Sequence, residues 1–136
     1  MKKVFLSYAP ADRAHAERLR RVLERDALTV SLDGGVDAAT SWRVAVRHVL
    51  RESSAMIALL SPNEGGVGVN QLFEVGMAIG IGLPVVAVLI QGDPDKIPTD
   101  LKSFRWVDAR RMGDEELGTE IRAALERELE SRGSSR

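Results

Sequence analysis

Two apolar stretches decide the fold: residues 55–60 read AMIALL and residues 84–90 read PVVAVLI. Neither alternates between apolar and polar side chains, as a strand does when one of its faces meets water. Both are also far too short to cross a membrane as a helix. Uninterrupted apolar runs of this length are typical of strands in a parallel sheet whose two faces are both covered. We therefore expect two central strands here.

Amphipathic segments lie on either side of these strands. Apolar residues at helical spacing predict helices over about 10–26, 42–50, 70–82 and 114–132, and short apolar runs predict further strands over 4–8, 28–32 and 104–107. Strands that alternate with helices indicate an α/β fold with right-handed crossovers. We predict a flavodoxin-like three-layer sandwich with a five-stranded parallel sheet. One domain would span residues 1–132, and residues 133–136 would form a flexible tail.

The composition of the chain argues against several classes of function. The 136 residues include 19 Lys or Arg and 20 Asp or Glu, so the formal net charge is −1 and no dominant positive field favours nucleic acid. There is no cysteine, which excludes disulfides and thiolate zinc sites, and two histidines are too few for most histidine metal sites. We expect no metal site and no cofactor. The start of the chain resembles no signal peptide and no segment suits membrane insertion, so a cytoplasmic location is expected.

The charges are distributed unevenly along the chain. The 40 residues from Ser53 to Gly92 carry only two formal charges, Glu64 and Glu74. This stretch is therefore expected to be mostly interior, and a carboxylate on its predicted helix is costly to bury without a partner. Glu74 has two interpretations. It either lies on an exposed stripe or caps a neighbouring loop, or it is a functional carboxylate that shares a helix face with Asn70 and Gln71.

A binding site is expected at one edge of the sheet. In parallel α/β sheets, ligands bind beyond the carboxyl ends of the strands. Here those ends are Ser7-Tyr8, Leu32-Asp33 and Ser61-Pro62. The loops that follow them are the candidate site.

The order of these pieces resembles the bacterial form of the Toll/interleukin-1 receptor (TIR) domain. The similarity covers roughly residues 2–130, and it is the order and spacing of the motifs together that make it specific. The matching segments and residues are 4–8 with Asp12, 31–33, Trp42, 57–62, Glu74 with Ala78, 83–88 and 104–106.

The resemblance implies an enzymatic activity. Many such domains cleave NAD between nicotinamide and ribose, and some make cyclised ADP-ribose signals. They depend on a Glu of the third helix, to which Glu74 corresponds. Glu74 would then contact the ribose hydroxyls and stabilise an oxocarbenium-like transition state. NAD would be the substrate, self-association with other TIR domains would accompany activity, and the role would lie in bacterial defence or signalling.

The resemblance also implies a set of substrate-binding residues. Ser7 and Tyr8 would line the nicotinamide end of the site, and Asp33 with loop 34–40 would gate the cleft. Trp42 and Asn70 complete the set. Trp42 also begins an apolar helical stripe and so suits the core, and Asn70 stands where relatives often carry an aromatic side chain.

Two alternatives remain open. Residues 73–85 (FEVGMAIGIGLPV) also resemble the nucleoside 2-deoxyribosyltransferases, in which a Glu of the equivalent helix attacks the sugar carbon as a nucleophile. Strand 5–8 fits that family poorly. The other alternative is a TIR-type interaction module, whose loop 33–40 and helix faces dock other TIR domains without catalysis.

Overall fold

The chain alternates strands with helices throughout the part that a computed structural model describes, residues 3–25, 28–32, 42–62, 68–97, 101 and 104–134. The side chains of 42–45, 69, 70 and 132–134 lie outside this description. The strands are β1 Lys3–Ser7, β2 Thr29–Leu32, β3 Ala55–Leu60, β4 Val85–Leu89 and β5 Arg105–Asp108. The helices are α1 Arg13–Glu24, α2 Trp42–Glu52, α3 Val69–Gly80 and α4 Asp114–Ser134, with short 3₁₀ turns at Pro10–Asp12 and Pro94–Lys96.

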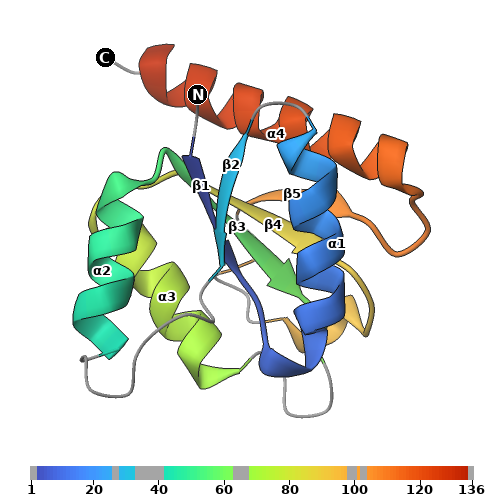
Figure 1. The fold of residues 1–136 in the computed structure, drawn as a ribbon, viewed down its shortest axis with the longest axis horizontal. Helices are drawn as coiled ribbons and strands as arrows, with labels where there is room; N and C mark the ends of the chain where they lie inside the picture. Colours follow the sequence, from blue (N-terminus) through green and yellow to red (C-terminus); the bar gives the residue numbers. More distant parts are fainter. Residues whose placement is uncertain are drawn as a thin grey trace.

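The five strands form one parallel sheet in the order β2-β1-β3-β4-β5 (Figure 1). This order reverses beside β1, because the chain first runs outward to β2 and then returns past β1 to β3. In the β1–β3 ladder, Ser7 lies opposite Ala58 at the last pair, so the two strands end close together. The predicted flavodoxin-like architecture is confirmed.

Helices cover both faces of the sheet, with α1 and α4 on one face and α2 and α3 on the other (Figure 1). The central strands supply alternate residues to the two cores. In β4, Val86 and Val88 pack under α1 and α4, whereas Val85, Ala87 and Leu89 pack under α2 and α3. Burial on both sides explains why the strand sequence is apolar without a break.

The boundaries of the elements differ slightly from the predictions. Strand β3 begins and ends as predicted, and β5 is shifted one residue toward the C-terminus. Helix α4 continues to Ser134, so Gly133 and Ser134 are helical rather than part of a tail. No helix in the described part of the chain is long and apolar enough to span a membrane.

Candidate functional site

Buried polar side chains gather at one edge of the sheet. Among the described residues, four polar or charged side chains are buried: Ser7, Asp12, Gln71 and Glu74. Ser7 ends β1, Asp12 lies in the turn that follows it, and the other two lie on α3, which packs on β1 and β3. The carboxyl ends of β1 and β3 therefore carry a polar cluster, as expected for a ligand site of this fold.

Glu74 is the most deeply placed carboxylate of the cluster. Its side chain is 1% exposed, so the interpretation that placed it on an exposed stripe is wrong. The hydroxyl of Ser7 donates a hydrogen bond to Glu74 Oε1 over 2.7 Å. This hydrogen bond holds the carboxyl group of Glu74 at the end of β1.

The inner face of α3 explains how Glu74 comes to be buried. Among the side chains of α3 that the structure describes, those of Gln71, Glu74, Val75 and Ala78 are buried, at i, i+3, i+4 and i+7. The first two lie near the strand ends, and the last two pack in the core below α2 and α3. Gln71 Nε2 donates to the carbonyl oxygens of Ser7, over 3.1 Å, and Leu59, over 2.6 Å.

A second carboxylate is tied to the neighbouring strand. The Ser61 hydroxyl, just beyond β3, donates a hydrogen bond to Asp12 Oδ2. Asp12 is 2% exposed, and its backbone N–H bonds the carbonyl oxygen of Ala9. This bond joins the turn after β1 to the segment after β3, so it fixes the shape of the edge beside Glu74.

Tyr8 does not join this cluster. Its side chain packs with the core residues below α1 and α4, whereas Ser7 bonds a residue of α3 on the opposite face. Successive side chains at the end of a strand point to opposite faces of the sheet, which separates the two neighbours. The prediction that Tyr8 lines the same end of the site as Ser7 is therefore not supported by this packing.

The remaining predicted site residues lie outside the described part. Asp33 and loop 34–40 fall there entirely, and so do the side chains of Trp42 and Asn70. Their proposed contacts stay predictions.

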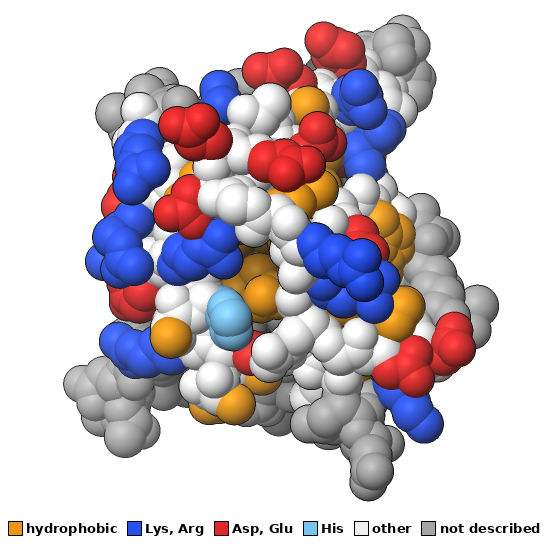
Figure 2. Space-filling view, turned by 90° about the vertical axis from the view of Figure 1, so that its right-hand side faces the viewer, with side chains coloured by type: hydrophobic (Ala, Val, Ile, Leu, Met, Phe, Trp, Pro, Cys, Tyr) orange, Lys and Arg blue, Asp and Glu red, His pale blue; other side chains and the backbone are white. Residues whose placement is uncertain are grey.

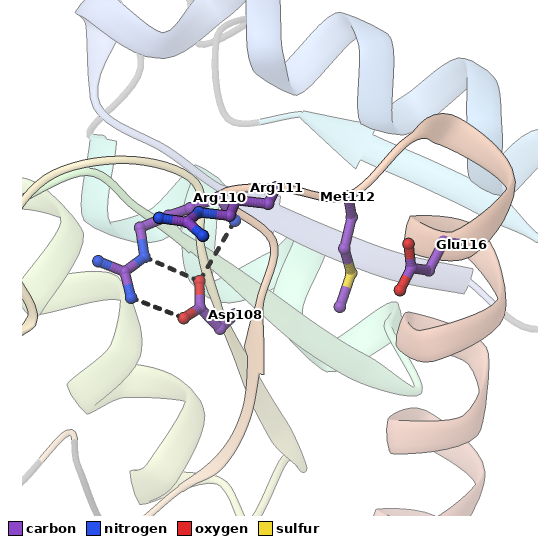
Figure 3. A pocket seen from close by; sticks show the side chains of 5 residues that line it. All are labelled: Asp108, Arg110, Arg111, Met112 and Glu116. Atoms are coloured by element: carbon purple, nitrogen blue, oxygen red, sulfur yellow. Dashed lines mark hydrogen bonds and ion pairs between the residues drawn. The ribbon is translucent and has the colours of Figure 1, made fainter.

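A separate pocket opens at the carboxyl end of β5. It is lined by Asp108, Arg110, Arg111, Met112 and Glu116, from the end of β5, the following loop and the first turn of α4 (Figure 3). On the side of the molecule that carries α1 and the start of α4, acidic and basic side chains are mixed around a hollow with hydrophobic side chains inside it (Figure 2). The pocket itself balances two acidic against two basic side chains, so it presents no single dominant charge.

One ion pair organises this pocket. Arg110 Nε and Nη2 donate to the two oxygens of Asp108 over 2.9 and 2.7 Å. These side-chain hydrogen bonds, with a further bond from the Arg110 backbone N–H, lower the pKa of Asp108 from 3.8 to about 2. The same bonds raise the pKa of Arg110. Asp108 therefore stays ionised at any physiological pH.

Sequence reasoning missed three members of the polar edge. Gln71 was noticed as a neighbour of Glu74, but its bonds to strand carbonyls depend on the register of the sheet. Ser61 was recognised only as a strand end, and Asp12 only as part of a motif. One signal was available: Ser7 and Ser61 both stand at the carboxyl ends of predicted strands, which places their hydroxyl groups at the same edge of the sheet.

Searches for relatives agree with this architecture. No curated protein matches the chain. Among solved structures, a heterodimer of the TIR domains RPS4 and RRS1 is 16% identical with a TM-score of 0.63, and the match covers 95% of this chain and 99% of that one. The CMP N-glycosidase BcmB of Clostridium botulinum is 17% identical with a TM-score of 0.63, over 90% and 99% of the two chains.

A third neighbour is the 2-deoxyribosyltransferase of Bacillus psychrosaccharolyticus. It is 15% identical with a TM-score of 0.62, over 85% of this chain and 90% of that one. At these identities the three structures establish the shared fold. The family assignment comes from the sequence itself, because the family model described as the TIR domain matches residues 4–125. The chain therefore belongs to the TIR domain family.

Proposed function

We propose that this TIR domain cleaves NAD at the bond between nicotinamide and ribose. The observation that carries the proposal is the buried Glu74 carboxylate, held by the Ser7 hydroxyl at the carboxyl edge of the sheet. A fixed negative charge in a water-poor site stabilises a developing cation far more than it would in water.

Cleavage of this bond requires few protein groups besides Glu74. The nicotinamide ring of NAD carries a positive charge, so it leaves as a neutral molecule with the electron pair of the broken bond. The ribose carbon then develops oxocarbenium character, and the Glu74 carboxylate stabilises it through charge and through contact with the ribose hydroxyls. Water attacks this carbon and loses a proton, which gives ADP-ribose. Attack by a nitrogen of the adenine instead would give a cyclic product.

The test is nicotinamide release from NAD by the purified protein. Glu74→Gln keeps the shape of the side chain and an acceptor for Ser7 but removes the charge. We expect release to fall by about two orders of magnitude or more, in line with the loss of an electrostatic stabiliser. No release from the wild type at any protein concentration, or equal release from Glu74→Gln, would contradict the proposal.

A substrate panel separates this activity from its nearest alternative. The solved neighbours include a 2-deoxyribosyltransferase and a CMP N-glycosidase. A carboxylate such as Glu74 also suits nucleophilic attack on the sugar carbon of a deoxynucleoside. Incubation with a deoxynucleoside and a second free base would then produce the exchanged nucleoside, whereas an NAD glycohydrolase would leave both unchanged.

One observation favours a second candidate function, docking onto a second copy of this chain without catalysis. The large exposed hydrophobic side chains of the described residues lie on α3 and just after it: Phe73, Ile79 and Ile81. Glu74 is the one formal charge on this helix and it is buried, so two such surfaces would meet without like-charge repulsion. A Glu74→Gln variant that retains full signalling function would favour docking over catalysis.

A further inference from the structure

Gln71 occupies a position that neither the proposed chemistry nor core packing explains. Its side chain is 4% exposed, and its amide nitrogen faces two backbone carbonyl oxygens, those of Ser7 and Leu59. Carbonyl oxygens only accept, so both N–H groups of the amide are engaged at once. An apolar residue of this size would fill the same volume without the cost of burying an amide.

The carbonyl oxygens of Ser7 and Leu59 lie where the ladder between β1 and β3 ends. Ser7 with Ala58 is the last pair between β1 and β3, and Leu59 is the next residue along β3. Gln71 therefore attaches α3 to β1 and β3 at their carboxyl ends. Two hydrogen bonds from one buried amide to these two strands favour one placement of the helix.

The same strand residue is bound by α3 at two of its atoms. Gln71 bonds the carbonyl oxygen of Ser7, and Glu74, one turn later, accepts from the Ser7 hydroxyl. Two bonds from one helix turn to one residue define both the rotation of the helix and its position along the strand. Loss of the Gln71 bonds would remove one of the two attachments between this turn of α3 and Ser7.

We propose that Gln71 is a positioning residue, which sets the place of the Glu74 carboxylate by attaching α3 to the ends of β1 and β3. The proposal rests on the function proposed above. Gln71 would make no contact with NAD, so its loss acts on the reacting geometry rather than on binding. A misplacement of about 1 Å is enough to lower a reaction rate by roughly a hundredfold.

The test compares two Gln71 variants with a matched control. Gln71→Met keeps the volume and removes both donors, and Gln71→Glu keeps the shape but turns oxygens toward two carbonyl oxygens. The control is Trp106→Phe, which removes the side-chain donor that Trp106 gives to the carbonyl oxygen of Leu101, over 3.2 Å, on the far strand of the sheet. Each variant is measured for Tm and for kcat and KM of nicotinamide release.

We expect all three variants to lose thermal stability. Only the Gln71 variants should lose kcat, by about tenfold or more, with KM changed less than about threefold. An unchanged kcat in folded Gln71→Met would overturn the proposal, as would an equal loss in Trp106→Phe. If both Gln71 variants fail to fold, the residue serves stability and the positioning role is rejected.

A crystal structure of Gln71→Met tests the inference apart from the proposed activity. We expect the bond from Ser7 to Glu74 to be lost or α3 to be displaced, even if the wild type releases no nicotinamide. An unaltered Ser7–Glu74 bond in that structure would reject the positioning role. Absence of nicotinamide release from the wild type would reject the proposed function alone.

Discussion

The hydrogen bond between Ser7 and Glu74 links stability to the proposed chemistry. Both side chains are almost fully buried, so removal of either one breaks a hydrogen bond that water cannot readily replace. The Ser61–Asp12 bond repeats this arrangement on the adjacent strand. The edge of the sheet thus holds two hydroxyl–carboxylate pairs, of which only one involves the proposed catalytic group.

Ser7→Ala removes the donor to Glu74 and leaves the carboxylate in place. We expect the free energy of unfolding to fall by about 1–3 kcal/mol, the usual range for the loss of one buried hydrogen bond to a carboxylate. Nicotinamide release should fall as well, because the carboxylate is less firmly oriented. Urea unfolding and the release assay measure the two effects. Ser61→Ala is the matched control, with a comparable loss of stability and a smaller loss of activity; the reverse ranking would contradict the assignment.

The Asp108–Arg110 pair predicts a pH dependence. The pKa of Asp108 is lowered to about 2 in the folded protein from 3.8. The folded state therefore favours the carboxylate, and this contribution to stability is present above about pH 4 and is lost as the pH falls through about 2. The effect should be small because both side chains are largely exposed.

Unfolding of Asp108→Asn across this range measures the contribution. The free energy difference between wild type and variant should be larger near pH 5 than near pH 2. A difference that stays constant over the range would show that the pair does not titrate as described.

At the level of elements, the central strands were the most predictable part of the protein. The residues of β3 and β4 are apolar on both sides because helices cover both faces, and this pattern is visible in the sequence without knowledge of the fold. The low charge of residues 53–92 singles out Glu74 but leaves both an exposed and a buried position open, and the structure decides for the buried one.

The partners of Glu74 were harder to foresee. Gln71 and Leu59 meet only because of the way α3 lies across β1 and β3, and nothing local to either residue encodes that distance. The prediction groups Tyr8 with Ser7 because the two are adjacent in the sequence, whereas the structure places their side chains on opposite faces of the sheet.

The surroundings of two glycines predict that substituting them will destabilise the protein by different amounts. Gly92 has φ +96°, and a Cβ there would lie 2.2 Å from the carbonyl oxygen of Pro62, just after β3. Gly82 has φ +77°, and a Cβ there meets no atom within 4 Å. The positive φ disfavours a side chain at both positions, but only at Gly92 would a Cβ also clash with a neighbouring backbone atom.

We expect Gly82→Ala to cost about 1 kcal/mol through backbone strain alone. Gly92→Ala should cost more, about 3 kcal/mol or above, because the backbone beside Ser61 must move. Chemical denaturation of both variants provides the comparison. Equal losses would show that the contact with Pro62 relaxes without cost.

The whole molecule presents two different surfaces. The side that carries α1 and the start of α4 presents acidic and basic side chains around a hollow with hydrophobic side chains (Figure 2), whereas the outer face of α3 carries no charge in its described part. A charged surface of mixed sign keeps a protein soluble, and an uncharged apolar one favours association.

Ile79→Glu tests whether copies of the chain meet through α3. Ile79 is 53% exposed, so a glutamate is tolerated there without disturbing the core. We expect the variant to self-associate at least about tenfold more weakly, because burying its charge opposes docking. Sedimentation over a range of concentrations gives the affinity. Thr119→Glu, an exposed position on α4, adds the same charge elsewhere. Equal weakening by both variants would exclude α3 as the contact.

The separation of Ser7 and Glu74 in the sequence affects when their hydrogen bond can form during synthesis. The two residues lie 67 positions apart in the sequence, and α3 packs on the ladder that joins β1 and β3. Contacts of such separation form late in folding, after local helices. A nascent chain that has emerged from the ribosome only as far as β3 has no carboxylate in place. Any activity of this edge must therefore await synthesis and docking of the third helix.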